Sequence, residues 1–318
     1  MHVRYLNATE AFECLPGVIM DNGDPKETRN GMAYSMGEPM VVSIDNPEDR
    51  LILNDKRDIH YPAVLAETLW VLAGRNDVSY LDKYLKNLRN YSDDGYTWRG
   101  AYGYRWRHHF GKDQIETAIN RLHNYPNDRR TIISMWDASM DLNNENHWKD
   151  LPCNMLIKLQ VRKGMLDMTV FNRSNDLVWG ALNVNIFQFT LLQEYIAARL
   201  CIPVGYYNLV SDDLHIYEET AHKIQGSVPK ETPISSMLFD CPEEFMRELE
   251  KWMKEHDNYF LIEDTYENSI LNEAKHIINA YRIFKRDKKV GMALEYLQDY
   301  ETTALIYAMK DWLSRRNK

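Results

Sequence analysis

The sequence lacks any apolar run long enough to cross a membrane, and it contains few cysteines. A membrane-spanning helix needs about 18 or more consecutive apolar residues, whereas the longest apolar runs here are interrupted by Asn, Gln or Glu. The first residues, MHVRYLNATEAFECLPGV, show no continuous apolar segment after their basic residues, so we expect no secretion signal. These absences predict a soluble, cytoplasmic protein.

The four cysteines are far apart in the sequence: Cys14, Cys153, Cys201 and Cys241. No C-x-x-C pair indicates zinc, and no dense cysteine spacing indicates a disulfide framework. We therefore expect reduced thiols and no metal site.

Excess positive charge is also missing, because 38 basic residues stand against 47 acidic ones and give a net charge of −9. Such a surface does not attract a polyanion non-specifically, so we expect no direct nucleic-acid binding. A local basic pocket is still compatible with this net charge. A content of 44% apolar and 12% aromatic residues excludes global disorder. The length of 318 residues fits one large domain or two ordinary ones.

Periodicity predicts a mixed α+β architecture. A hairpin of two strands is expected around Lys163 and Gly164, and it lies between Cys153 and Arg173. The mostly apolar segment 185–200 is expected to be the central buried helix. The predicted strands cover residues 39–44, 129–135, 155–161 and 165–171, and the other predicted helices cover 63–72 and 113–123.

Beyond about residue 226 the sequence becomes rich in loops and then strongly helical. Pro229, Pro233 and Pro242 are followed by an apolar stripe from Ile270 to Phe284 with helical spacing. A second helix is predicted over about 290–313. The pattern predicts a body over 1–225 and a loop-rich and helical extension over 226–318 that ends in a helical hairpin.

A set of motifs in a fixed order connects these elements. They are TRNG at 28–31, AETLWVLAG at 66–74, AYGYRWR at 101–107, DRRTIISMWD at 128–137, PCN at 152–154, FNRSND at 171–176 and DLHIY at 213–217. Over about residues 28–220 the chain resembles thymidylate synthase and its relatives, the pyrimidine nucleotide hydroxymethylases. The resemblance implies a thymidylate-synthase-like mixed sheet with a long buried helix, and it makes 1–225 the catalytic domain. It also implies a homodimer that uses a deoxypyrimidine monophosphate and 5,10-methylenetetrahydrofolate as substrates.

Cys153 is the candidate nucleophile. Carbon 5 of a pyrimidine is a poor nucleophile, and adding a thiolate at carbon 6 turns it into an enolate-like electron source. The predicted hairpin returns Arg173 toward Cys153, where its charge would favour the thiolate. The alternative for an isolated cysteine is a small buried core residue.

Glu67 and Tyr102 are the other candidate catalytic residues. Glu67 occurs in an otherwise apolar helix, where a buried carboxylate is costly unless it is paired or functional. The resemblance implies that Glu67 organises proton transfer through water and that Tyr102 assists removal of the carbon 5 proton. The alternatives are a structural ion pair and a core aromatic residue.

A nucleotide phosphate requires fixed cations, and guanidinium groups fit phosphate oxygens well. The resemblance assigns this role to Arg29, Arg129, Arg130, Arg173 and the hydroxyl of Ser174. It further implies that Arg129 and Arg130 reach the phosphate in the partner subunit of the homodimer. Outside such a motif, an Arg-Arg pair usually belongs to a solvated face.

The remaining site residues concern the sugar, the base and the folate. By resemblance, His215 and Tyr217 bind the sugar 3′-hydroxyl, Asp176 contacts the folate pterin ring, and Asn185 reads the base edge. An amide can both donate to uracil O4 and accept from N3–H, so Asn185 favours uracil over cytosine. The assignment requires one inserted residue between 180 and 185, and without it Val184 would occupy the position.

Several positions depart from a synthase, which must exclude water while folate delivers a hydride. Leu88 and Tyr91 stand where tryptophans are expected, Asn154 replaces a histidine and Asn172 a glutamine, and the final DWLSRRNK is not the short apolar tail that closes over folate. We therefore expect water to reach the exocyclic methylene. The expected activity is that of a deoxyuridylate (dUMP) hydroxymethylase.

The alternative enzyme is a divergent thymidylate synthase that converts dUMP to dTMP. A third hypothesis is a non-catalytic nucleotide-binding protein of the same fold, with the helical tail as its interaction surface. The combined presence of Cys153, Glu67, Tyr102 and Arg173 argues against that hypothesis, because a binding module has no need of a nucleophile.

Overall fold

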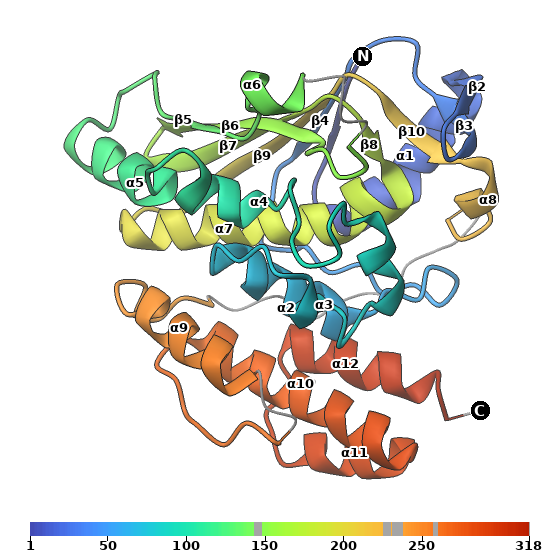
Figure 1. Ribbon diagram of the computed structural model, residues 1–318, viewed down its shortest axis with the longest axis vertical. Coiled ribbons are helices and arrows are strands. Elements are labelled where there is room, and N and C mark those ends of the chain that lie inside the picture. The colour runs from blue at the N-terminus through green and yellow to red at the C-terminus, as the bar shows by residue number, and fades with distance from the viewer. Residues whose placement is uncertain (143–147, 225–229, 231–237, 257–259, 318) are drawn as a thin grey trace.

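The larger sheet forms the upper layer of the protein in Figure 1. The computed structural model describes residues 1–142, 148–224, 230, 238–256 and 260–317. Within these ranges a six-stranded mixed sheet has the order β1-β4-β9-β7-β6-β5. Its strands are β1 (His2–Tyr5), β4 (Met40–Ile44), β9 (Val204–Ser211), β7 (Met165–Asn172), β6 (Asn154–Arg162) and β5 (Ile132–Ser134). Of the strand predicted over 129–135, only residues 132–134 form a strand in the structure.

A second sheet of four strands lies beside the first, in the order β2-β3-β10-β8. The strands β10 and β8 are parallel, and their register places His215 opposite Asp176. Two residues predicted to bind different substrates therefore lie side by side. The strands are β2 (Asp24–Thr28), β3 (Gly31–Ser35), β8 (Asn175–Asp176) and β10 (Leu214–Tyr217).

The predicted hairpin is confirmed as β6 and β7. Its turn has positive φ at Lys163 (52°) and Gly164 (79°), as a two-residue turn that follows the twist of the strands requires. At the open end of the hairpin, Asn154 pairs with Asn172. The residues just outside this pair, Cys153 and Arg173, are consequently neighbours.

The central buried helix is α7 (Ile186–Arg199), and its residues from Ile186 to Ala197 are all buried. It packs against β7, β9 and α2. A π-helical segment, η4 (Leu177–Asn185), leads into it and is interrupted at Leu182. A π-helical turn accommodates one more residue than an α-helical turn, so this segment has room for the inserted residue that the Asn185 assignment requires.

Helix α2 (Tyr61–Leu72) lies between α7 and the C-terminal helices (Figure 1). It begins at His60, whose ring nitrogen accepts a hydrogen bond from the backbone of Ala63 at 3.0 Å. It ends before Gly74, which has a φ of 70°. The other helical elements of the body are α1 (Ala8–Asn22), α3 (Val78–Leu81), η1 (Lys86–Tyr91), α4 (Tyr102–Tyr104), η2 (Arg105–His109), α5 (Gln114–Asn124), α6 (Ala138–Asp141) and α8 (Glu218–Ala221).

The extension contains α9 (Phe245–His256), α10 (Ser269–Asp287), α11 (Val290–Gln298) and α12 (Ala304–Ser314). The single helix predicted over 290–313 is wrong, because Thr303 starts a new helix there. Its hydroxyl accepts from the backbone of Ile306 and donates to Glu273 at 2.6 Å. The predicted boundary between residues 225 and 226, together with Pro229 and Pro233, lies outside the described residues.

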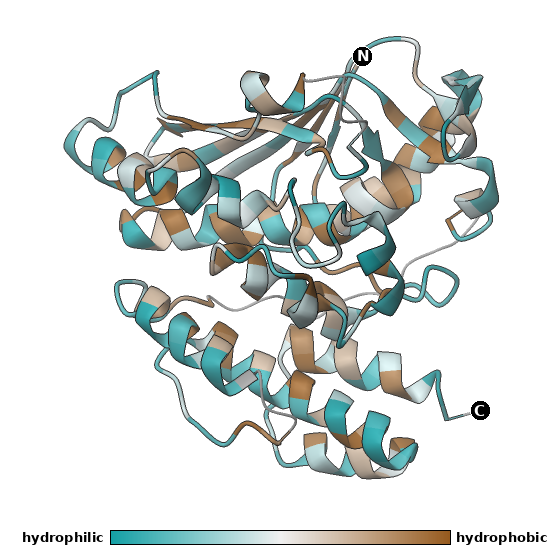
Figure 2. Cartoon of the chain, in the orientation of Figure 1, coloured by the Kyte–Doolittle hydropathy of each residue, from teal (hydrophilic) through white to brown (hydrophobic). Residues whose placement is uncertain are grey.

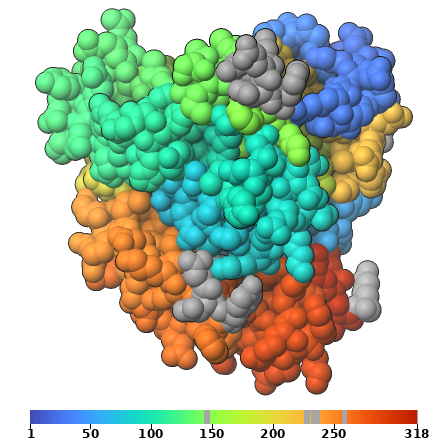
Figure 3. Space-filling view, in the orientation of Figure 1, coloured from blue at the N-terminus to red at the C-terminus, as the bar shows by residue number. Residues whose placement is uncertain are grey.

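The extension packs directly on the body. His60 contacts Tyr281 of α10 and Trp312 of α12, with ring centroids 5.1 and 4.9 Å apart. Figure 2 shows apolar residues along the strands and on the helices between the sheet and the extension. In Figure 3 the extension, coloured orange to red, adjoins the body without a visible break. No helix in the described ranges is both long and apolar enough to span a membrane.

Candidate active site

Cys153 and Arg173 meet at the open end of the β6–β7 hairpin. The backbone N–H of Arg173 donates to the Cys153 carbonyl at 2.9 Å, and its Nη2 lies 3.8 Å from Sγ of Cys153. The guanidinium also donates to the carbonyls of Pro152 at 3.1 Å and Leu151 at 3.3 Å. The predicted proximity of these two residues is therefore present in the structure.

The surroundings of Cys153 determine the protonation of its thiol. Burial raises the pKa of Cys153, the charge of Arg173 lowers it, and the neighbouring Asp150 raises it again. The net result is a pKa above the ordinary value. Since the thiolate is the reactive form, a proton acceptor is needed when the nucleophile attacks.

A cavity of about 200 Å³ brings Glu67, Tyr102 and Asn185 together. It is bounded by α2, η4 and α7 and by the segments around residues 81–102. Leu88, at a position where the resemblance expects tryptophan, is part of its wall. The full lining is Glu67, Trp70, Val71, Leu81, Leu88, Trp98, Gly100, Ala101, Tyr102, Asp150, Asn185 and Gln188.

Glu67 is a carboxylate of this cavity whose pKa lies near neutrality. Burial raises the pKa of Glu67 to about 7, and a hydrogen bond from Gln188 partly opposes this rise. The Gln188 Nε2 donates to Oε1 of Glu67 at 3.1 Å. A group with such a pKa exchanges protons readily at neutral pH. Sequence reasoning missed Gln188, although an amide in a largely apolar helix was a signal.

Tyr102 lies close to the nucleophile. Its ring stacks on Phe189 with centroids 5.9 Å apart. Burial raises the pKa of Tyr102 well above the ordinary value, the charge of Cys153 raises it further, and a hydrogen bond with the backbone of Asn154 opposes the rise. Tyr102 therefore stays protonated at neutral pH and can act as a hydrogen-bond donor.

Asp150 is a half-buried carboxylate that sequence reasoning missed. Its Oδ2 accepts from the backbone N–H of Gly100 at 2.8 Å, and burial raises its pKa. It borders the same cavity as Glu67. No periodicity distinguishes Asp150 from the other acidic residues of its loop, so only the folded structure identifies it.

Asn185 enters the cavity from the last position of η4. Its Nδ2 donates to Oδ1 of Asn175 at 3.2 Å. A Cβ atom at Gly180 would lie 2.5 Å from that same Oδ1 and 3.1 Å from Nδ2 of Asn185. Gly180 is therefore required for the two amides to approach each other. Asn183 instead donates to the Trp179 carbonyl at 3.2 Å.

Asp176, His215 and Tyr217 lie on the small sheet. Asp176 caps η4 by accepting from the backbone of Val178 at 2.8 Å, and burial raises its pKa. His215 and Tyr217 have ring centroids 4.9 Å apart, and Asn30 donates to the Tyr217 hydroxyl at 3.3 Å.

Arg57 was not found from the sequence, yet it lies beside Asp176 and interacts with its charge. Its Nε donates to the Val178 carbonyl at 3.0 Å, and its guanidinium lies 4.5 Å from the ring centroid of Trp179. Burial lowers the pKa of Arg57 to about 10, and Asp176 counters this effect. Its buried Nη2 makes no hydrogen bond to the described residues, so it can receive a ligand acceptor.

The predicted phosphate ligands fall into two groups. Arg29 donates to the Lys149 carbonyl at 3.3 Å, and its charge lowers the pKa of Cys153. Ser174 directly follows Arg173 at the end of β7. Arg129 and Arg130 lie just before β5, where Arg130 pairs with Asp128 at 3.1 Å and its side chain is 82% exposed. One chain therefore does not bring Arg129 and Arg130 to Cys153.

Two of the departures from the synthase pattern form a single structural feature. Asn154 Nδ2 donates to Oδ1 of Asn172 at 2.9 Å, and both side chains are almost fully buried. The two replacements therefore accommodate each other at the base of the nucleophile's hairpin.

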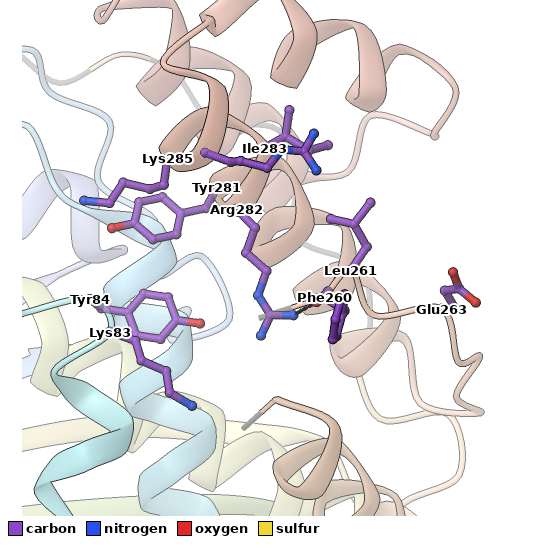
Figure 4. Close-up of a pocket in the computed structure, with 10 residues that line it drawn as sticks. Lys83, Tyr84, Phe260, Leu261, Glu263, Tyr281, Arg282, Ile283 and Lys285 are labelled. Carbon is purple, nitrogen blue, oxygen red and sulfur yellow. Dashed lines mark hydrogen bonds between the residues drawn. The ribbon is translucent and has the colours of Figure 1, made fainter. Parts of the chain in front are cut away.

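A larger cavity of about 690 Å³ lies elsewhere, between the segment after α3 and the extension (Figure 4). Tyr84 and Tyr281 stack across it with centroids 5.6 Å apart. None of the described residues that line this cavity belongs to the predicted site. Among the described residues, no three His, Cys, Asp or Glu are placed to hold a metal ion.

Comparisons with known proteins identify the family to which the chain belongs. A family model described as thymidylate synthase matches residues 10–253. The chain is 35% identical over 315 residues to a deoxyuridylate hydroxymethyltransferase of Pseudomonas phage M6, covering 92% of this chain and 88% of the relative. It is 29% identical over 309 residues to the protein of the same name from Bacillus phage SP01, covering 86% and 80%.

A more distant relative is a thymidylate synthase of Corynebacterium aurimucosum, with 27% identity over 233 residues, covering 70% of this chain and 84% of the relative. Among solved structures, thymidylate synthase from T4 phage superposes with a TM-score of 0.60 at 24% identity, covering 77% of this chain and 91% of that one. The α+β fold prediction is thereby confirmed. The chain belongs to the thymidylate synthase family.

Proposed function

We propose that this enzyme is a dUMP hydroxymethylase that moves a one-carbon unit from 5,10-methylenetetrahydrofolate to carbon 5 of dUMP and completes the reaction with water. The observation that carries the proposal is the position of Leu88 in the cavity wall beside Glu67 and Tyr102. A leucine there in place of a tryptophan weakens the aromatic barrier against water. The similarity to two phage deoxyuridylate hydroxymethyltransferases over most of the chain supports it further.

The reaction begins when Sγ of Cys153 adds to carbon 6 of the base. Arg173, 3.8 Å from the sulfur, stabilises the thiolate that attacks. Carbon 5 then becomes nucleophilic and takes up the methylene group of the folate. Tyr102, whose hydroxyl bonds to the backbone next to the nucleophile, assists the loss of the carbon 5 proton.

Glu67 moves protons during the formation and breakdown of the carbon bridge. Its pKa of about 7 permits both donation and acceptance of a proton near neutral pH. Gln188 fixes one carboxylate oxygen of Glu67, and the other oxygen can form a hydrogen bond with a water molecule or with the base. Once carbon 5 has lost its proton and tetrahydrofolate has left, water adds to the exocyclic methylene and forms the hydroxymethyl group. The thiolate of Cys153 is then eliminated from carbon 6, which restores the double bond between carbons 5 and 6 and frees the enzyme.

Base recognition falls to Asn185. Its side chain is held by Asn175, which leaves the Oδ1 of Asn185 for the N3–H of uracil. Uracil accepts a hydrogen bond at O4, whereas cytosine carries a donor at that position. The amide of Asn185 can be oriented to donate to O4. The proposed substrate is therefore the uracil nucleotide.

Folate binds, in this proposal, on the side of Asp176. The adjoining residues fit an anionic aromatic substrate: Arg57 has a buried nitrogen without a hydrogen bond to the described residues, and Trp179 offers an aromatic ring that is 47% exposed. An acceptor oxygen of the folate can use that nitrogen.

The phosphate of dUMP is bound by Arg29, Arg173 and Ser174 of one subunit and by Arg129 and Arg130 of a second. The exposure of Arg130 is consistent with a role across an interface. The face of the large sheet opposite to α7 carries Leu156, Phe171 and Val210, which are paired across neighbouring strands and partly exposed. These three residues form an apolar strip beside Lys158, Thr169 and Asn208 on the same face, and the strip supports a homodimer formed through the sheet.

A divergent thymidylate synthase remains the second candidate, and Trp98 favours it because an indole still lines the cavity. The two functions differ in their products. Incubation with dUMP and methylenetetrahydrofolate should yield 5-hydroxymethyl-dUMP by mass spectrometry, without the absorbance of dihydrofolate. Formation of dTMP together with an equal amount of dihydrofolate would identify a synthase instead.

A further inference from the structure

The loop between the β-bridge residue Leu53 and helix α2 carries Arg57 into the site. Asn54 organises the loop, because its Oδ1 accepts from the backbone N–H of Lys56 at 3.0 Å and of Arg57 at 2.9 Å. Asp58 then adopts a left-handed φ of 45°. Consequently Arg57 points inward to η4, while the neighbouring Asp55 and Asp58 are available to the extension.

The end of helix α12 holds this loop from outside. Arg316 approaches Asp58 with two nitrogens, Nη1 at 3.1 Å from Oδ1 and Nη2 at 2.7 Å from Oδ2. Arg315 adds a bond from Nε to Oδ1 at 3.1 Å. Burial raises the pKa of Asp58, but the two guanidinium groups outweigh this effect, so the pKa lies below its ordinary value. A two-nitrogen contact of this kind fixes orientation as well as distance.

A second set of ion pairs also joins this loop to the end of α12. Lys230 joins Asp55 at 2.7 Å to Asp311 of α12 at 2.8 Å, and Arg315 also reaches Asp55 at 3.3 Å. The loop and the end of α12 are therefore linked at several points, which makes the network more rigid than one exposed pair.

Aromatic packing ties the same helix to the start of α2. The Arg316 guanidinium stacks on Trp312 at 3.5 Å from the ring centroid. Trp312 in turn contacts His60, the residue that caps α2. Since α2 also carries Glu67, one helix of the extension contacts both the loop of Arg57 and the support of the proposed proton carrier (Figure 1).

We propose that helix α12 positions the folate side of the active site. Arg315 and Arg316 at its C-terminal end hold Asp58. Asp58 in turn keeps Arg57 against Val178 and Trp179, beside Asp176. The inference rests on the proposed function, because it takes the surface around Asp176 as the folate side. Asp58, Arg315 and Arg316 are positioning residues, since they act through Arg57.

A held guanidinium binds its ligand with a smaller loss of conformational freedom than a mobile one. Loosening the loop should therefore weaken folate binding and leave dUMP binding unchanged, because the nucleotide is assigned to Cys153, Arg173 and Asn185. This selectivity distinguishes positioning from a general loss of stability.

The test is Asp58→Asn, which removes the charge of the loop and retains a residue type that tolerates positive φ. The matched control is Asp287→Asn, which removes an acid bonded to Arg286 in the same extension at 2.9 and 2.8 Å. We expect Asp58→Asn to raise the KM for methylenetetrahydrofolate about three- to tenfold, within the range that misplacing a positioning group produces. The KM for dUMP should stay unchanged, and Asp287→Asn should match the wild type in both.

An unchanged folate KM in Asp58→Asn, or an equal rise in both KM values, would overturn the proposal. The double variant Arg315→Ala/Arg316→Ala should reproduce the selective folate effect, and its midpoint of urea unfolding shows whether it is folded. Tetrahydrofolate binding in the presence of dUMP, measured by calorimetry, separates this inference from the proposed function. Weaker binding in Asp58→Asn supports the positioning role even if the product assay rejects the hydroxymethylase, whereas equal binding refutes it.

Discussion

Replacing Glu67 by glutamine should stabilise the protein at alkaline pH while it destroys activity. Glutamine has the shape of glutamic acid, and its carbonyl can still accept the hydrogen bond from Gln188. What disappears is the ionisable group, whose pKa burial raises from 4.5 to about 7. The variant therefore isolates the free energy of ionising Glu67 in its buried position.

The sign and the size follow from proton linkage. Between pH 4.5 and about 7 the folded protein holds a proton on Glu67 that the unfolded chain has released, so stability falls as the pH rises through this range. The pKa difference corresponds to about 3 kcal/mol at about 1.4 kcal/mol per pH unit. Glu67→Gln should thus gain nothing at pH 4 and about 3 kcal/mol at pH 8 relative to the wild type.

Urea unfolding of both proteins at pH values from 4 to 8.5 measures this difference, and Glu250→Gln is the control. Glu250 is exposed, and its bond to Lys254 lowers rather than raises its pKa, so its variant should show no alkaline gain. Turnover of Glu67→Gln should fall by about two to four orders of magnitude, as expected for a lost acid–base group. A pH-independent stability difference for Glu67→Gln would refute the half-buried carboxylate with a pKa near neutrality.

Three further changes probe the rest of the site. Cys153→Ser should abolish turnover but change dUMP affinity by less than about tenfold, because the thiolate makes the covalent bond and the arginines supply most of the binding; normal turnover would exclude Cys153 as nucleophile. Asn185→Asp should move the ratio of kcat/KM toward deoxycytidylate by about tenfold or more, and an unchanged ratio would mean that another residue reads the base. Gly180→Ala should destabilise the protein by about 1–3 kcal/mol in urea and raise the KM for dUMP, since its Cβ would lie 2.5 Å from Asn175; a variant identical to the wild type would show that the two amides do not need this approach.

The elements that the sequence predicts well are those whose stability is local. The β6–β7 hairpin combines a turn at Lys163 and Gly164 with strands of β-type sequence, so both its position and the meeting of Cys153 with Arg173 follow from the chain itself. The buried helix α7 is equally apparent, because its sequence is mostly apolar.

The errors arise where long-range contacts decide the structure. At the break between α11 and α12, Thr303 caps the new helix and donates to Glu273, which lies 30 residues earlier. Apolar spacing alone continues across that break.

Arg57 and Asp150 could not be predicted from the sequence because their surroundings also depend on long-range contacts. The charged run Asp55-Lys56-Arg57-Asp58 and the polar loop of Asp150 both look solvated in sequence. Burial against Val178 and Gly100, respectively, becomes visible only in the folded chain.

The central claim is that water, not a folate hydride, completes the reaction at the exocyclic methylene. The most direct measurement is turnover of dUMP with methylenetetrahydrofolate in water enriched in heavy oxygen, followed by mass spectrometry of the nucleotide. The account predicts one heavy oxygen atom in the new hydroxymethyl group and release of tetrahydrofolate. A methylated nucleotide without heavy oxygen, formed together with dihydrofolate, would contradict it.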